Sequence, residues 1–145
     1  MKNYLFLAIV TLITVSIVSL AQTSAEFEIG PNKIRLHKQQ LSKRTVRIEL
    51  KTKTAKENEL VLLVFDKNVH DKSHKLVGGG RTESVTFMGA EFCCVASAEF
   101  EVPTDATYYI YVNNKTDAVQ KYKIDLFEKC DECDDGWRVK HLPGL

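Results

Sequence analysis

Apolar and polar residues alternate with a period of two in several segments of the chain after residue 25. That period is typical of a strand with one buried face, because successive side chains of a strand point to opposite sides. The alternation predicts strands at 45–51, 99–102, 107–113 and 121–126. In 107–113 it places Tyr108, Ile110 and Val112 inward, which leaves Tyr109 and Tyr111 on the other face.

A continuous apolar run, Leu60 to Phe65, breaks this alternation. Such a run is typical of a central strand that is buried on both faces. Weaker strands are expected at 33–36, 75–77 and 84–87. Glycine and asparagine tolerate positive φ, so Gly78-Gly79-Gly80 and Asn113-Asn114 are expected to form turns.

The pattern as a whole comprises about eight short strands separated by turn signals, without an amphipathic helix. It predicts an all-β protein, an antiparallel β-sandwich of the jelly-roll type. The sandwich domain is expected to span 26–128. Residues 129–145 form a cysteine-containing tail that we expect to pack on the domain, held by disulfides.

The last two predicted strands, Ala106-Thr107-Tyr108-Tyr109-Ile110-Tyr111-Val112-Asn113 and Lys121-Tyr122-Lys123-Ile124-Asp125-Leu126, are expected to form a closing hairpin. This pair resembles the end of pre-peptidase C-terminal-type domains, in which a Thr-Tyr-aromatic strand precedes a Tyr-x-Leu/Ile-x-Leu/Val strand. The resemblance implies a jelly-roll sandwich that acts as a non-catalytic binding or solubilising module. It carries no functional residue over to this chain.

The amino terminus has the pattern of a secretion signal. Lys2 precedes an apolar stretch from Tyr4 to Ala21, and small residues fit cleavage after Ala21 or Ala25. The alternative is an uncleaved membrane anchor, since the stretch approaches the length needed to span a bilayer. We expect residues 1–25 to be a signal peptide, the protein to be secreted, and the mature chain to have no membrane span.

Charge is balanced, with 20 basic and 19 acidic residues in the whole chain. Loss of Lys2 with the signal would leave equal numbers. A neutral chain has no net electrostatic attraction to nucleic acid or to an anionic membrane, so neither is expected as a partner.

All four cysteines lie in the second half of the chain, as the adjacent pair Cys93 and Cys94 and the spaced pair Cys130 and Cys133. In a secreted protein such cysteines favour disulfides. We expect the tail pair to cross-link to the adjacent pair, because closing each pair on itself requires a strained vicinal bond. Two alternatives are a redox-active Cys-x-x-Cys motif and a zinc site built from the four sulfurs.

Three further groups of residues could carry chemistry. The acidic residues of the tail are weak candidates for Ca²⁺ ligands: Asp131, Glu132, Asp134 and Asp135. His70 and His74 lie four residues apart, but their segment reads as an exposed loop. Asn114-Lys115-Thr116 is an N-glycosylation sequence that we expect to be accessible in a loop.

No nucleophile elbow, zinc-protease motif or phosphate-binding loop occurs in the sequence. The outward aromatic residues Tyr109 and Tyr111, together with Trp137, are the candidates for ligand contact. We therefore predict a monomeric or weakly associating secreted module, without a cofactor, that binds an extracellular carbohydrate, lipid or protein. The alternatives are a small redox or metal-dependent enzyme that uses the cysteines, and a structural component of a matrix or envelope.

Overall fold

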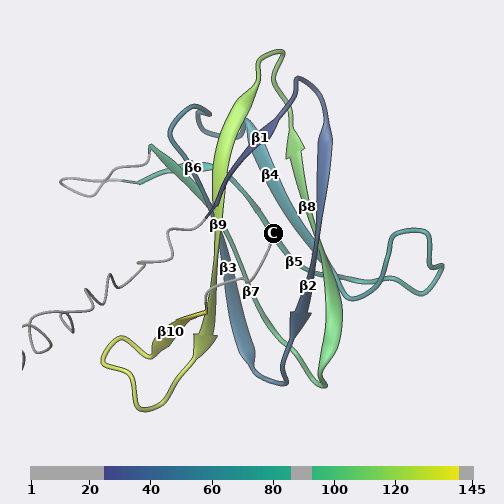
Figure 1. Ribbon diagram of the computed structural model, residues 1–145, viewed down its shortest axis with the longest axis vertical. Helices are drawn as coiled ribbons and strands as arrows, with labels where there is room; N and C mark the ends of the chain where they lie inside the picture. The colour runs from purple at the N-terminus through teal and green to yellow at the C-terminus, as the bar shows by residue number, and fades with distance from the viewer. Residues whose placement is uncertain (1–24, 86–92, 141–145) are drawn as a thin grey trace, which may run out of the picture.

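The computed structural model describes residues 25–85 and 93–140. These residues form ten strands and no helix (Figure 1). The strands are β1 (Glu26–Ile29), β2 (Ile34–Leu41), β3 (Thr45–Thr52), β4 (Leu60–Phe65), β5 (Leu76–Arg81), β6 (Glu83–Ser84), β7 (Cys94–Glu101), β8 (Ala106–Asn114), β9 (Gln120–Lys129) and β10 (Trp137–Lys140).

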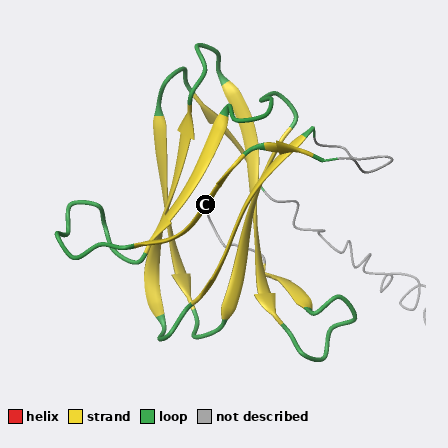
Figure 2. Cartoon of the chain, turned by 180° about the vertical axis from the view of Figure 1, so that it is seen from behind, coloured by secondary structure: helices red, strands yellow, loops and turns green. Residues whose placement is uncertain are grey.

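The strands form two antiparallel sheets that pack face to face, as the two layers in Figure 2 show. Sheet A has the order β1-β9-β3-β7-β6, with β10 added beside β9, and sheet B has the order β2-β8-β4-β5. From β1 to β4 the chain alternates between the sheets, and it does so again from β7 to β9. This order of strands is that of a jelly roll, so the predicted fold is confirmed.

The core lies between the sheets and is built from the inward positions of each strand. Val46, Ile48 and Leu50 of β3 are fully buried, as are Leu60, Leu62 and Val64 of β4. In β8, Tyr108, Ile110 and Val112 are buried while Tyr109 and Tyr111 are not. The period of two in the sequence therefore assigned the inward faces of these strands correctly.

The predicted closing hairpin is wrong. β8 pairs with β2 and β4 in sheet B, whereas β9 pairs with β1, β3 and β10 in sheet A. The connection between them crosses from one sheet to the other. Alternation within each strand identifies the buried face but contains no information about which strand lies alongside.

The predicted glycine turn is also wrong, because Gly78, Gly79 and Gly80 lie inside β5 opposite Leu62–Val64 of β4. Here the glycines allow close approach of neighbouring backbones. A Cβ atom at Gly80 would lie 2.6 Å from the Ser97 carbonyl oxygen of β7, in the other sheet. The glycines therefore close one side of the sandwich by backbone contact instead of reversing the chain.

The tail folds back on the domain as a strand: β10 pairs with the end of β9. A disulfide joins Cys130 to Cys133 within the turn before β10, while Cys93 and Cys94 are free. The predicted cross-link between the two pairs is therefore wrong.

The register of sheet A explains why the two cysteine pairs are not cross-linked. Cys94 lies opposite Thr52, and Cys130 follows Glu128, which lies opposite Val46 of the same strand. Six strand residues correspond to roughly 20 Å, far beyond the reach of a disulfide. The four sulfurs consequently do not form the single cluster that a four-cysteine zinc site requires. The redox-active motif needs only Cys130 and Cys133 and stays a prediction.

The predicted signal segment, residues 1–25, lies almost entirely outside the described residues. Among the residues that are described, no helix is long and apolar enough to cross a membrane.

Candidate functional site

The outer face of sheet B is the most unusual surface of the described residues. Its outward side chains form three rows across the four strands: Ile34–Asn113–Val61–Arg81, Leu36–Tyr111–Leu63–Gly79 and Lys38–Tyr109–Phe65–Leu76. Most of these side chains are aliphatic or aromatic. The solvated face of an antiparallel sheet is usually polar, so this face departs from the expected pattern.

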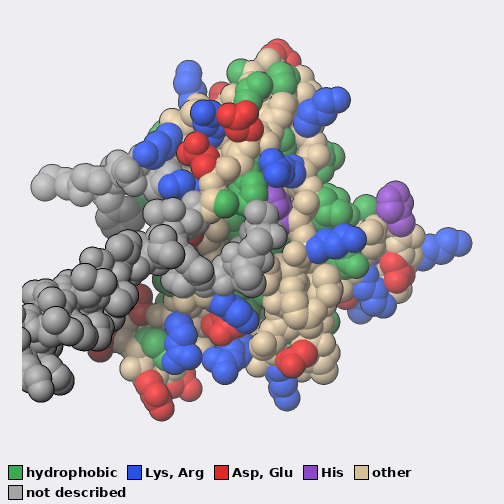
Figure 3. All heavy atoms as spheres, in the orientation of Figure 1, with side chains coloured by type: hydrophobic (Ala, Val, Ile, Leu, Met, Phe, Trp, Pro, Cys, Tyr) green, Lys and Arg blue, Asp and Glu red, His purple; other side chains and the backbone are tan. Residues whose placement is uncertain are grey.

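Several of these side chains are open to solvent. Ile34 is 62% exposed, Leu76 57% and Leu36 38%. They are three of the five large apolar side chains that are exposed in the described part of the chain; the others are Val119 and Val139. In Figure 3, hydrophobic side chains reach the surface beside the loop that projects to the right, next to Lys and Arg side chains.

The strand β4 explains why sequence reasoning missed this surface. Its apolar run was expected to be buried on both faces, but only Leu60, Leu62 and Val64 are buried in the sandwich. Val61, Leu63 and Phe65 are half-buried on the outer face, where no third layer of described residues covers them. The same run of apolar residues is the sequence signal that could have identified the surface.

The aromatic rings of this face pack against one another. The Phe65 ring lies edge-on to Tyr111, with 5.6 Å between centroids, and 5.3 Å from the His74 ring. The Lys38 ammonium lies 5.9 Å from the centre of the Tyr109 ring. These contacts are of the kind that stabilise pairs of aromatic rings and the placement of a cation over a ring.

The loop between β4 and β5 borders this face and is ordered by local hydrogen bonds. The backbone N–H of Lys75 donates to Asp66 Oδ1 at 2.7 Å, and that of Ser73 donates to Asp71 Oδ1 at 2.8 Å. His70 is exposed in this loop, whereas His74 packs on Phe65. The two histidines therefore lie in turns, not on a helix that would align them.

Trp137 lies on the other sheet and is not brought near Tyr109 or Tyr111. It extends from β10 over the outer face of sheet A, where the Arg47 guanidinium carbon lies 4.5 Å from the Trp137 ring centre and 4.8 Å from that of Phe127. Arg47 also pairs with Glu49 at 3.1 Å. The Trp137 ring thus packs against a charged cluster of its own chain.

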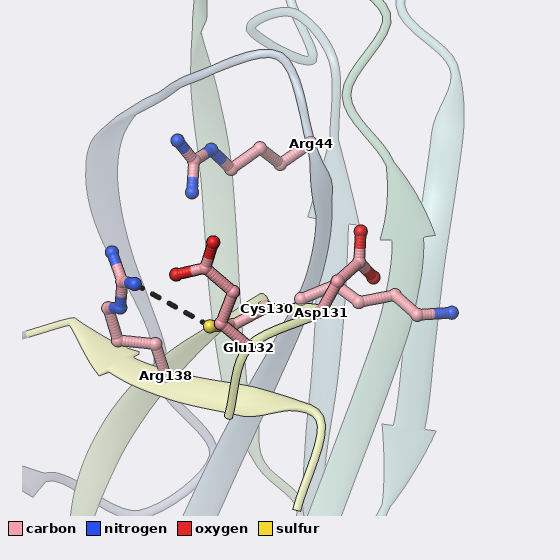
Figure 4. Close-up of a pocket in the computed structure, with 6 residues that line it drawn as sticks. Arg44, Cys130, Asp131, Glu132 and Arg138 are labelled. Carbon is pink, nitrogen blue, oxygen red and sulfur yellow. Dashed lines mark hydrogen bonds between the residues drawn. The ribbon is translucent and has the colours of Figure 1, made fainter. Parts of the chain in front are cut away.

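A polar hollow of about 350 Å³ adjoins the disulfide turn, lined by Arg44, Lys129, Cys130, Asp131, Glu132 and Arg138 (Figure 4). Arg138 donates to Cys130 Sγ at 3.5 Å, and Arg44 lies 3.7 Å from Glu128. In the view of Figure 4 the Glu132 carboxylate lies between the guanidinium groups of Arg44 and Arg138. The hollow therefore contains both basic and acidic side chains of the chain itself.

The acidic residues of the tail do not converge. Asp131, Glu132, Asp134 and Asp135 are exposed, and Asp135 accepts a hydrogen bond from the Trp137 backbone N–H at 3.0 Å. In the ranges that the structure describes, no group of three or more His, Cys, Asp or Glu side chains is placed to hold a metal ion. Asp135 instead shapes the turn that leads into β10.

The two free cysteines differ in their surroundings. Cys93 is exposed, whereas Cys94 is buried at the start of β7. Burial, reinforced by a hydrogen bond with Cys93, raises the pKa of the Cys94 thiol to about 11. Because the thiolate is the nucleophile, Cys94 is unreactive in the folded protein and Cys93 is the accessible thiol.

The expectation that Asn114 is accessible is wrong. Its side chain is fully buried at the end of β8. The amide nitrogen donates to the carbonyl oxygens of Gly30 and Ala118, and the amide oxygen accepts from the backbone and hydroxyl of Thr116. The sequence pattern Asn-x-Thr is here a structural element of the β8–β9 connection.

Comparison of the chain with protein-family models, with curated proteins and with solved structures finds no match. The resemblance of residues 106–126 to pre-peptidase C-terminal-type domains stays a prediction.

Proposed function

We propose that this protein is a secreted, non-catalytic module that binds another extracellular protein through the outer face of sheet B. The observation that carries the proposal is the contiguous apolar surface on this face, where a solvated sheet would present polar side chains. Monomeric proteins rarely expose large contiguous apolar patches unless these serve in binding.

The chemistry of the surface favours a protein over a carbohydrate. Sugar recognition needs polar side chains that can pair with many hydroxyl groups, whereas the centre of this face consists of Leu36, Leu63, Phe65 and two tyrosines. An apolar, tyrosine-containing centre with charged residues at its border is characteristic of protein interfaces. No carboxylate, serine or cysteine occurs in the three rows, whose ionisable side chains are Lys38, Arg81 and the two tyrosines.

Two features support an extracellular setting. The first 25 residues have the pattern of a secretion signal. The second feature is the disulfide between Cys130 and Cys133, because disulfides form and persist mainly in oxidising compartments.

A matched pair of variants tests the proposal. Leu36→Gln with Leu76→Gln removes apolar area from sheet B, and Val119→Gln with Val139→Gln removes similar exposed area elsewhere. Labelled wild-type protein is expected to bind saturably to the extracellular protein fraction of its source cells. The sheet B variant should lose at least tenfold in affinity, while the control variant keeps it.

Both variants must remain folded, as judged by an unfolding midpoint close to that of the wild-type protein. The exposed positions of the four substitutions favour this result. Equal binding by the two variants, or loss in the control variant only, would refute the assignment of this face.

A further inference from the structure

Charged residues are segregated between the two sheets. Every Asp and Glu in the described strands lies in sheet A: Glu26, Glu28, Glu49, Glu83, Glu99, Glu101, Asp125 and Glu128. The strands of sheet B contain no carboxylate but do contain Arg35, Lys38 and Arg81. A chain with nearly balanced charge, 20 basic and 19 acidic residues, therefore has one sheet whose strands contain basic but no acidic residues.

Two of these cations border the apolar rows. Lys38 lies on the edge strand β2 and Arg81 on the opposite edge strand β5, at diagonal corners of the face. Both side chains are exposed. They can therefore pair with an occupant of the face while the apolar centre between them becomes buried.

The β4–β5 loop extends this basic border. Lys67, Lys72 and Lys75 are exposed there. The carboxylates of the same loop, Asp66 and Asp71, accept hydrogen bonds from the backbone of the loop itself. Lys67 Nζ donates to Ser73 Oγ within the loop at 2.7 Å, whereas Lys72 and Lys75 are exposed in the segment that leads into β5.

We infer that the partner of sheet B presents an apolar centre bordered by carboxylates. This inference rests on the proposed function and specifies the chemistry of the partner. Complementary charge at the border of an interface selects the partner and speeds association. A second copy in a face-to-face arrangement fits poorly, since it would bring Lys38 and Arg81 of both copies together without a carboxylate from either face.

Two synthetic hairpin peptides with the same Trp and Leu content provide the test, one bearing four Glu and the other four Lys. Each is titrated into the ¹⁵N-labelled secreted chain, and amide shifts report where it binds. The acidic peptide is expected to shift amides of β2, β4 and β8. The basic peptide is expected to bind at least tenfold more weakly.

Charge reversal at the border provides a second measurement. Lys38→Glu with Arg81→Glu should weaken binding of the acidic peptide about tenfold and strengthen that of the basic peptide. The matched control, Lys121→Glu with Lys129→Glu, makes the same charge change at exposed positions of β9 in sheet A and should bind as wild type does. The milder pair Lys38→Gln and Arg81→Gln replaces the reversal if that variant does not fold.

The outcomes separate this inference from the proposed function. Equal binding of both peptides to sheet B would refute the acidic partner and leave the binding face intact. Binding of neither peptide to sheet B would count against both. Shifts on sheet B with phosphatidylserine vesicles, but with neither peptide, would replace a protein partner by a membrane surface and overturn the inference.

Discussion

His37 makes the stability of this protein depend on pH in a predictable direction. The side chain is 5% exposed, and its Nε2 lies 2.7 Å from the Tyr122 hydroxyl. The Phe27 ring lies 4.7 Å away. Burial, with a smaller contribution from the positive charge of Arg35, lowers the pKa of His37 from 6.5 to about 4.

The magnitude follows from the difference between the folded and unfolded pKa. Above about pH 6.5 neither state holds the proton, so His37 adds no pH dependence. Between pH 6.5 and about 4 the unfolded state binds a proton that the folded state does not, so stability falls as the pH falls. At about 1.36 kcal/mol per pH unit, the loss is about 2 kcal/mol at pH 5 and about 3 kcal/mol below pH 4.

Urea unfolding at about pH 7.5 and about pH 5 measures this loss. The wild-type protein should be about 2 kcal/mol less stable at the lower pH through His37. His37→Gln should lower stability at the higher pH but lack this component of the pH dependence. His70→Gln, at an exposed loop position, should keep the wild-type dependence. Identical pH profiles for wild type and His37→Gln would show that His37 is not the source of the pH dependence.

Three further predictions concern packing, hydrogen bonding and thiols. Gly80→Ala should lower the free energy of unfolding by about 2–3 kcal/mol, because its Cβ would meet a carbonyl oxygen of β7. Gly30→Ala should cost less than about 1 kcal/mol, since only a flexible side chain lies nearby. Equal costs for the two variants would contradict this packing. Asn114→Ala should lower the free energy of unfolding by about 3 kcal/mol, because it leaves buried polar groups unpaired. Asn113→Ala, at a half-buried position, should lower it much less. Urea unfolding of the two variants measures the difference. Alkylation followed by mass measurement should label one thiol, Cys93, in the folded protein and a second thiol, Cys94, after unfolding. The remaining two cysteines should be labelled only after reduction. Four unlabelled sulfurs before reduction would contradict this pairing.

The sequence predicted the local features of the fold well and the long-range ones poorly. Alternation identified the buried residues of β3, β8 and β9 because the period of two is set within each strand. It could not show that β8 and β9 belong to different sheets, since that depends on residues far away in the sequence. The glycines of β5 were mistaken for a turn for the same reason, as the close approach that requires them involves β7 of the other sheet.

The candidate site was half visible in the sequence. Tyr109 and Tyr111 were expected on an outward face, and the structure places them there. Their neighbours Leu36 and Leu63 come from other strands, and only the register of sheet B brings them together. The disulfide pairing was not predictable either. Cys94 and Cys130 flank opposite ends of β3, and this distance between them depends on how β7 and β9 pair with β3 in the assembled sheet.

Position-resolved photo-crosslinking tests most directly the claim that sheet B is the binding face. A benzophenone amino acid replaces Leu36 on sheet B or Val139 on sheet A, both exposed apolar positions. The two labelled proteins are irradiated in the same extracellular protein fraction. A discrete crosslinked species that excess unlabelled protein suppresses is expected from position 36, and no such species is expected from position 139. A suppressible species from position 139 alone, or from both positions equally, would contradict the claim.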